Sequence, residues 1–416
     1  MAAAPRVVLV SGSGGSGRST VAAATARLAA ESGQRTLLLA ADDPHRTLDR
    51  LLDPGPGPAP ASGSAPGTRL TPTPAQLAPG LFAAALDPET AFRDTVERLL
   101  GRARTLFDLL GVEALDRDEI TALPGASQLA LLDALRTHGT DPDWDTVVVD
   151  APPVPELIAA LALPEQLDRY LARLLPEQRQ AARALRPVLA AFAGVPMPAD
   201  WLFEARARAA AELAEVRAVT DAPGTTVRLV TDAAAGPRAA AALRTARAGL
   251  ALHGRRVETL IVNRLLPDGA DPFLAALHKA QQEQLAALRL DWDVPVAELP
   301  HLGREPRGLD DPALLTGSGA LRPARIPGPA GPADWPVQDL LDTPDRVLVW
   351  RIPLPGADRA DLDLVRRGDE LALAVGPYRR TVALPSALRR CTVAGAALRD
   401  GVLAVRFAPD PRLWPR

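Results

Sequence analysis

Lysine and cysteine are nearly absent from this chain of 416 residues. Lys279 is the one lysine, so all but one of the 47 basic side chains are arginine. Cys391 is the one cysteine, which excludes a disulfide within the chain and a metal site built from several cysteines. A disulfide-stapled fold is therefore not expected, and Cys391 is interpreted as a small core residue rather than a reactive thiol.

Aromatic residues and long apolar runs are scarce too. Aromatic residues make up 4% of the chain, and no segment has about 18 uninterrupted apolar residues, so we expect no membrane-spanning helix. The net charge of −3 gives the whole molecule no attraction for nucleic acid or anionic lipid. With 47% hydrophobic and 23% charged residues, the composition is typical of a soluble globular protein, and the cytoplasm is the expected compartment.

Several glycines gather in one motif near the N-terminus. Residues 7–33 read VVLVSGSGGSGRSTVAAATARLAAESG, which predicts a strand, a turn and a helix. Residues 12–19 fit the phosphate-binding pattern G-x-x-x-x-G-K-[ST] at every fixed position except Arg18, where the pattern has lysine. Such a turn binds phosphate because backbone N–H groups converge on it and the helix N-terminus is partially positive. A turn without any ligand is the alternative interpretation.

The arginine at position 18 changes what this loop is expected to do. Lysine presents a compact charge to the β- and γ-phosphates, whereas guanidinium is planar, larger and prefers paired contacts. Because a misplacement of about 1 Å costs on the order of 100-fold in rate, we predict impaired hydrolysis with binding retained through the backbone. In the alternative, a chain poor in lysine carries arginine here with its function kept.

Strand and helix patterns alternate along most of the chain. Apolar strands at 35–41, 143–153, 224–233 and 255–267 are separated by helical periodicity. This predicts an α/β fold with a mainly parallel sheet, that of a P-loop NTPase domain over residues 1–320. The further segments predicted are a low-complexity loop at 53–80, helical insertions at 87–139 and 156–220, a Pro- and Gly-rich linker at 321–336 and a small antiparallel β-sandwich at 337–416.

The glycine loop resembles that of the ArsA family, the arsenite-pump and tail-anchored-protein-targeting ATPases of the deviant Walker group. The family pattern K-G-G-x-G-K-[ST]-T falls on residues 13–20, and both of its lysines are replaced, by Ser13 and Arg18. Ser13 stands where the family's signature lysine crosses a dimer interface, and Arg18 stands at the catalytic lysine position. The resemblance implies ATP and Mg²⁺ as cofactors, with Ser19 as a magnesium ligand. The nucleotide-binding residues that it implies in the loop are Gly14, Gly15, Ser16, Gly17, Arg18, Ser19 and Thr20.

Two further segments resemble the family's switches. The segment DDPHRTL at 42–48 resembles D-P-A-H-[NS]-L, and either Asp42 or Asp43 is the aspartate that activates the attacking water, depending on the alignment. An acidic turn that caps a helix is the alternative. Asp150 opens DAPPVPELIA, which corresponds to the second switch, and this position supports Mg²⁺ through water in P-loop proteins. The family's T-G-H is replaced there by Val-Pro-Glu at 154–156, which weakens the case for switching.

Two segments between residues 262 and 310 resemble the family's base-binding elements. The sequence VNRLLP at 262–267 resembles the segment whose asparagine, here Asn263, recognises adenine. The sequence ELPHLGREPRGLD at 298–310, which contains Pro300, resembles the loop that closes over the base. An ordinary proline-rich connection is the alternative for this loop. Taken in order, the motifs extend the resemblance over residues 5–315.

The helical insertions and the end of the chain bear on possible clients. In the targeting branch of the family, helices after the switches form a dimeric groove for a client's membrane segment. The matching stretches here, 87–139 and 156–215, are amphipathic, and helices of this kind usually face a core. The C-terminal strands resemble a small heat-shock, α-crystallin-like domain, whose exposed strand edges can take up unfolded segments. A passive domain that covers the ATPase is the alternative.

These features together predict an ATP-binding protein with weak ATPase activity that couples its nucleotide state to a polypeptide client or an anion. A second copy of the chain is a further expected partner, and nucleic acid is not. The alternative is an inactive pseudo-ATPase that serves as a chaperone-like scaffold, so the enzyme assignment stays open at this point. An arsenite-pump subunit is disfavoured because one cysteine offers no thiolate site for a metalloid.

Overall fold

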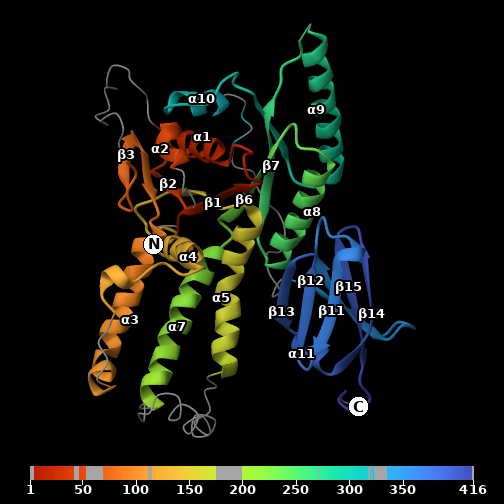
Figure 1. The fold of residues 1–416 in the computed structure, drawn as a ribbon. Coiled ribbons are helices and arrows are strands. Elements are labelled where there is room, and N and C mark those ends of the chain that lie inside the picture. The colour runs from red at the N-terminus through yellow and green to blue at the C-terminus, as the bar shows by residue number, and fades with distance from the viewer. Residues whose placement is uncertain are drawn as a thin grey trace.

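The computed structural model describes residues 4–41, 46–52, 69–110, 115–174, 199–269, 271–316, 319, 321–322 and 335–414. Figure 1 shows a large sheet with helices on both faces and a β-sandwich beside helix α8. Among the helices of these ranges, none is long and apolar enough to cross a membrane.

The large sheet has eight strands in the order β3-β4-β2-β5-β1-β6-β7-β8. Every neighbouring pair is parallel except β3 with β4, which confirms the predicted α/β fold with a mainly parallel sheet. Central strands such as β1 and β5 carry apolar runs because helices cover both of their faces, and β6 buries several polar side chains as well. Their bounds are β1 (Arg6–Gly12), β2 (Thr36–Ala40), β3 (Ala75–Ala78), β4 (Leu81–Ala85), β5 (Thr146–Asp150), β6 (Thr225–Asp232), β7 (Val257–Leu265) and β8 (Val296–Pro300).

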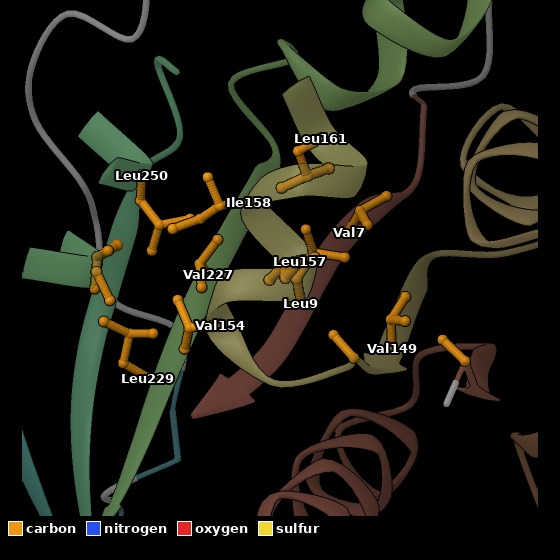
Figure 2. Close-up of a cluster of buried hydrophobic side chains, with 14 of the residues drawn as sticks. Val7, Leu9, Val149, Val154, Leu157, Ile158, Leu161, Val227, Leu229 and Leu250 are labelled. Carbon is orange, nitrogen blue, oxygen red and sulfur yellow. The ribbon is translucent and has the colours of Figure 1, made fainter. Parts of the chain in front are cut away.

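Helices on the two faces of this sheet bury two separate hydrophobic cores. On one face, Val7 and Leu9 of β1 pack with Leu157 and Leu161 of α5 (Figure 2). On the other face, Val8 and Val10 pack against the alanine-rich helix α1. Each fully buried valine or leucine contributes about 1.5–3 kcal/mol. The helices are α1 (Arg18–Glu31), α2 (Thr47–Leu52), α3 (Pro88–Leu110), η1 (Arg117–Glu119), α4 (Ala126–His138), α5 (Val154–Leu174), α7 (Ala199–Thr220), α8 (Pro237–Leu252), α9 (Pro272–Asp291) and α10 (Asp310–Thr316).

One sequence prediction for this domain needs correction. The segment 53–80 is predicted as a low-complexity loop, but its last part forms strand β3, which pairs with β4, and Leu70 is buried. Residues 53–68 lie outside the described part of the chain. Strand β3 was missed because its sequence, AQLA, has little strand propensity and owes its conformation to pairing with a neighbour.

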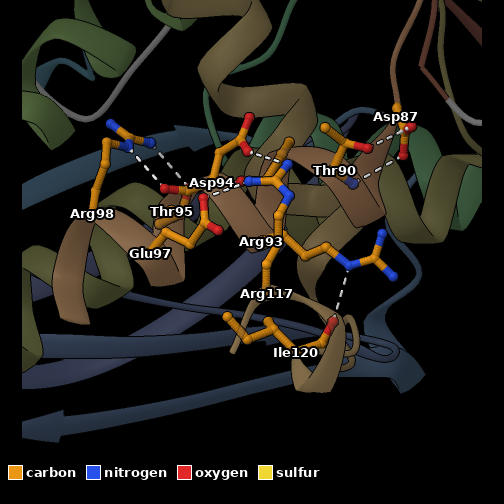
Figure 3. Close-up of polar contacts among 10 residues, drawn as sticks. Asp87, Thr90, Arg93, Asp94, Thr95, Glu97, Arg98, Arg117 and Ile120 are labelled. Atoms are coloured by element: carbon orange, nitrogen blue, oxygen red, sulfur yellow. Dashed lines mark hydrogen bonds and ion pairs between the residues drawn. The ribbon is translucent and has the colours of Figure 1, made fainter. Parts of the chain in front are cut away.

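Polar contacts fasten helix α3 to the short helix η1 (Figure 3). Arg117 of η1 pairs with both Asp94 and Glu97 of α3, and the Arg93 side chain donates to the Ile120 carbonyl at 3.0 Å. These groups are solvent-exposed, and pairs of that kind contribute at most about 1 kcal/mol each. They therefore set the position of the connection more than they stabilise the fold.

The C-terminal part forms two antiparallel sheets, with strand orders β14-β15-β10-β9 and β11-β12-β13. Their shared core contains Trp350 and Phe407, both fully buried, and also Cys391, whose thiol pKa is raised by burial. This confirms the predicted antiparallel sandwich. Its elements are β9 (Val337–Leu340), β10 (Val347–Pro353), η3 (Arg359–Asp361), β11 (Leu362–Arg367), β12 (Glu370–Val375), β13 (Tyr378–Ala383), α11 (Ser386–Arg389), β14 (Cys391–Arg399) and β15 (Val402–Pro409).

Helix α8 packs against both the large sheet and the sandwich. Its Leu250 lies in the core of the large sheet, whereas Ala248 and Leu252 lie in the core of the sandwich. The Tyr378 ring packs so closely on Gly249 that a Cβ atom there would lie 2.4 Å from it. The sandwich therefore docks on α8 by close apolar packing.

Candidate nucleotide-binding site

The glycine loop, Asp150 and Asn263, among the predicted site residues, lie at the carboxyl edge of the parallel sheet. Strand β1 lies between β5 and β6, with Val10 opposite Asp150 and Gly12 opposite Val230. The next pair places Asp232 of β6 opposite Asn263 of β7. Ligands in open α/β sheets bind at this edge, where the loops that follow the strands converge.

The glycine loop has the backbone shape that its sequence predicts. Gly15 and Gly17 have φ angles of 76° and 89°, in the left-handed region where a side chain causes strain, and Gly17 directly precedes α1. A Cβ atom on Gly12 would lie 2.1 Å from the Val230 carbonyl oxygen. The loop thus needs glycine at these three positions, at two because of the backbone angle and at Gly12 because of the close neighbour.

Side chains from β7 hold the carbonyl groups of this loop. The Asn263 amide donates from Nδ2 to the Ser16 carbonyl at 2.9 Å, and Asn263 is buried. The Arg264 guanidinium donates to the Gly15 carbonyl at 2.8 Å and pairs with Asp232 at 2.9 Å. In the described part of the chain, no backbone carbonyl accepts from the N–H of Gly14 or Gly15. A loop whose carbonyls are held from behind and whose N–H groups have no backbone acceptor among the described residues suits an anion.

Arg18 points to the second switch segment. Its guanidinium donates from Nη1 to the Ala151 carbonyl at 2.7 Å, and the Ser11 hydroxyl donates to the Pro152 carbonyl at 2.6 Å. Residues 151 and 152 directly follow Asp150 and precede α5. Two side chains of the loop region therefore hold the start of the second switch, and one of them stands at the position of the missing lysine.

The residues present fit a magnesium nucleotide. Asp150 ends β5, is 4% exposed and lies beside β1, while Ser19 is in the first turn of α1. Among the described residues, no three His, Cys, Asp or Glu side chains come together as a metal cluster. A P-loop magnesium ion does not need one, because it is held by a hydroxyl, phosphate oxygens and water.

The remaining predicted residues fall in three different places. Asp42 and Asp43 lie outside the described residues, so the choice between them stays open. Thr20 is in the first turn of α1, and Ser13 is exposed on the loop. Pro300 is exposed at the end of β8, opposite Leu265 of β7.

Sequence reasoning missed Asp232 and Arg264. Asp232 ends a predicted strand, and the rule that parallel strand ends meet at one edge could have placed it in the site. Arg264 has a φ of 65°, which is uncommon for a residue with a side chain, and no feature of the sequence predicts this. Arg264, which has this unusual backbone angle, is also a residue whose side chain binds the glycine loop. The pairing of β7 with β8 shifts register between Val262 and Leu265.

Comparison with known proteins agrees with this geometry. A family model described as anion-transporting ATPase, ArsA, matches residues 5–316. The chain belongs to the ArsA family. A second model, for the HSP20-like domain found in ArsA proteins, matches residues 345–407 of this ArsA-family chain, within the sandwich.

Two relatives match this ArsA-family chain over nearly its whole length. An uncharacterized protein of Streptomyces coelicolor is 52% identical, over 99% of both chains. A Mycobacterium tuberculosis protein is 34% identical, over 99% of this chain and 97% of its own. The arrangement of an ATPase domain followed by a sandwich is therefore shared with proteins of similar length.

Proposed function

We propose that this chain binds ATP and Mg²⁺ at its glycine loop, hydrolyses the nucleotide slowly, and uses the nucleotide state to control binding of a polypeptide client or an anion. The proposal rests on the family, on the intact loop backbone and on the altered side chain at its end. The observation that carries it is the hydrogen bond from Arg18 to the Ala151 carbonyl.

The loop retains the groups that bind phosphate. The N–H groups of Gly14 and Gly15 and the N-terminus of α1 supply a backbone cradle that needs no lysine. When bound, magnesium would neutralise phosphate charge, held by Ser19 and, through water, by Asp150. Either Asp42 or Asp43 orients the attacking water in this proposal. Binding is therefore expected to survive both lysine replacements.

Arg18 is the reason to expect slow hydrolysis. Its guanidinium donates from one of its N–H groups to a carbonyl of the second switch, so the side chain is directed to that segment, whereas the family's lysine is directed to the phosphates. A planar guanidinium also fits a tight phosphate loop less well than an ammonium group. The same bond ties the loop to the segment that starts α5, which offers a route from nucleotide state to the rest of the molecule.

Replacing Arg18 by lysine tests this proposal. We expect Arg18→Lys to raise Mg-dependent ATP turnover, measured as release of labelled phosphate, by about tenfold to 100-fold. Arg406→Lys in the sandwich is the matched control, since that arginine pairs with Asp345 at 2.9 Å outside the nucleotide-binding domain. Asp150→Asn gives the background rate. Equal turnover in wild type and Arg18→Lys would contradict the role given to the guanidinium.

A scaffold without ATPase activity is a second candidate function. The observation in its favour is strand β14, an edge strand of the sandwich whose residues are mostly exposed and which carries a bulge at Gly395. An exposed edge can pair with an extended polypeptide. If suppression of aggregation of a denatured test protein is the same with ATP, with ADP and without nucleotide, and turnover stays at background, the scaffold is the better description.

A homodimer that brings two glycine loops face to face is part of the first proposal. Ser13 is exposed where the family lysine would reach the partner's nucleotide. Sedimentation velocity with and without Mg-ATP tests it. A monomer under both conditions would exclude nucleotide-driven dimerisation.

A further inference from the structure

We propose that the groove between α5 and the β11-β12-β13 sheet is a binding site for a small, multiply charged oxyanion, carrying phosphate or carboxylate groups. The groove encloses a cavity of about 390 Å³ between the two parts of the molecule. It is separate from the glycine loop, and the proposal does not depend on nucleotide binding there.

One wall of the groove is a face of helix α5. Ala162, Gln166, Arg169 and Tyr170 line the cavity, and their spacing places them on one side of the helix. The Arg169 guanidinium lies 5.4 Å from the centre of the Tyr170 ring. Tyr170 is half exposed, so this wall offers a cation and an aromatic surface to a ligand.

The other wall is one face of the three-stranded sheet. Across the strands, Val365 pairs with Ala372 and Ala372 with Thr381, while Ala374 pairs with Arg379. The central strand β12 thus presents two alanines between longer side chains on the outer strands. Because these alanine side chains are small, they leave room above the central strand, and the cavity lies there.

The groove carries a surplus of positive charge. Among the described residues, four arginines and two carboxylates, Glu165 and Asp363, line it. Glu165 is already paired with Arg380 at 2.9 Å. Within the described part of the chain, Arg367 and Arg379 make no ion pair and both are exposed, so they are available to an anion. Arginine is the residue best suited to paired contacts with phosphate or carboxylate.

A buried histidine is the second, independent observation. His253 lines the cavity and is 4% exposed, and its Nδ1 atom has no hydrogen-bond partner among the residues that the structure describes. Burial, together with the positive charges of Arg380 and Arg255, lowers its pKa to about 3, so the ring is neutral at pH 7. A neutral imidazole has one N–H donor and one acceptor nitrogen. Because Nδ1 has under 1 Å² of accessible surface, a ligand in the cavity meets the ring through its other atoms. A neutral ring there does not offset the charge of an anion, but it gives a buried polar group beside the arginines.

Pyrophosphate and citrate are suitable probes, because one carries phosphate groups and the other carboxylates. Their binding is measured by titration calorimetry on the full chain carrying Gly14→Asp. This substitution adds a carboxylate to the glycine loop at a position where a Cβ atom meets no atom of the described residues within 4 Å, so anions are repelled there. We expect one site for at least one probe.

The double variant Arg367→Ser/Arg379→Ser, made in the same background, tests the location. We expect its affinity to be at least tenfold weaker. Arg399→Ser is the matched control, because Arg399 is an exposed strand arginine on the other sheet of the sandwich. It should leave the affinity unchanged. Equal affinity in the double variant and the control would overturn the proposal, and so would a lack of binding by both probes.

The ring nitrogens of His253 give a readout specific to the cavity. In ¹⁵N-labelled protein, their signals are expected to shift during titration of the Arg399→Ser chain and to stay fixed in the double variant. Binding that leaves the His253 signals unmoved would place the anion elsewhere and overturn the assignment.

Discussion

Gly17 is held to glycine by two separate constraints, a backbone angle and a close neighbour. Its φ of 89° lies in the left-handed region, and a Cβ atom there would lie 2.3 Å from Nδ2 of Asn263. That nitrogen is the donor to the Ser16 carbonyl. One added methyl group would therefore strain the backbone and also break the contact that orients the loop.

We predict that Gly17→Ala lowers the free energy of unfolding by about 1–3 kcal/mol and weakens nucleotide binding. The cost comes from a strained backbone angle and from displacement of the Asn263 amide. Chemical denaturation and titration with Mg-ATP measure the two effects. Gly14→Ala is the control, because Gly14 has open space around its Cβ position and no positive φ. Equal losses in the two variants would contradict the steric argument.

His253 makes a testable contribution to the pH dependence of stability. Its pKa is about 3 in the folded chain and about 6.5 when unfolded. Below pH 6.5 the unfolded state therefore binds a proton that the folded state does not, and stability falls as the pH drops from 6.5 towards 3. The loss from this group at pH 5, relative to pH 7, is about 2 kcal/mol.

A His253→Gln chain is expected to lose that much less stability between pH 7 and pH 5, measured by denaturant unfolding at each pH. His301→Gln, at an exposed histidine, is the control and should follow the wild type. If His253→Gln shows the same pH slope as the wild type, the buried ring does not carry the effect.

At the scale of elements, the central strands could be predicted from sequence and the outer ones could not. Runs such as VVLV at 7–10 and VVV at 147–149 are apolar without interruption, because both faces of those strands are covered. Strand β4, with the sequence LFAAA, has the alanine content of a helix and was not assigned. Strand β8 was also not assigned, because proline stands next to it at 295 and inside it at 300.

The candidate site, too, could be predicted from sequence only in part. The glycine loop and Asp150 could be placed from sequence because a strand end and a helix start fix them. The contact of Arg18 with Ala151 joins residues 133 positions apart, and neither propensity nor spacing encodes such a contact. The residues that bind the loop from β7 depend in the same way on strand order.

A buried ion pair joins β6, β7 and the segment after α10. The Arg228 guanidinium donates to Glu258 at 2.6 Å and to the Leu321 carbonyl at 2.8 Å, and both charged side chains are about 1% exposed. Burial lowers the pKa of Arg228, while Glu258 opposes that shift. Removing one charge would leave the other buried without compensation, which is the costly case.

We predict that Glu258→Gln destabilises the chain by about 3–5 kcal/mol in urea unfolding. Glu283→Gln is the control, since Glu283 is 70% exposed and lies 4.0 Å from Lys279. A pair of that kind is worth well under about 1 kcal/mol. Similar unfolding midpoints for the two variants would show that the buried pair does not stabilise the sheet.

At the scale of the whole molecule, the close packing on α8 couples the two parts. In an exposed helix, replacing glycine by alanine normally stabilises by about 0.5–1 kcal/mol. Gly249 is different because its Cβ position is filled by the Tyr378 ring. The same substitution there pushes the sandwich away from α8.

Gly249→Ala is therefore expected to destabilise the chain by about 1–3 kcal/mol, seen in calorimetry as a lower transition temperature. Gly101→Ala, at a position in α3 with nothing within 4 Å, should raise it slightly. Adding Tyr378→Ala to Gly249→Ala removes the steric clash. In the Tyr378→Ala background, Gly249→Ala should therefore lower the transition temperature less than it does in the wild type. An increase for Gly249→Ala alone would show that the sandwich does not sit against α8 in solution.

The packing of the sandwich on α8 also has a consequence during synthesis of the chain. The face of α8 that carries Ala248 and Leu252 is completed by residues of the sandwich, which begin at Trp335. The ribosome adds about 5–20 residues per second. That face of α8 therefore stays uncovered for several seconds, until the sandwich has been synthesised. A ribosome-bound chain stalled before Trp335 should therefore recruit holding chaperones at α8, and one extended beyond the sandwich should release them.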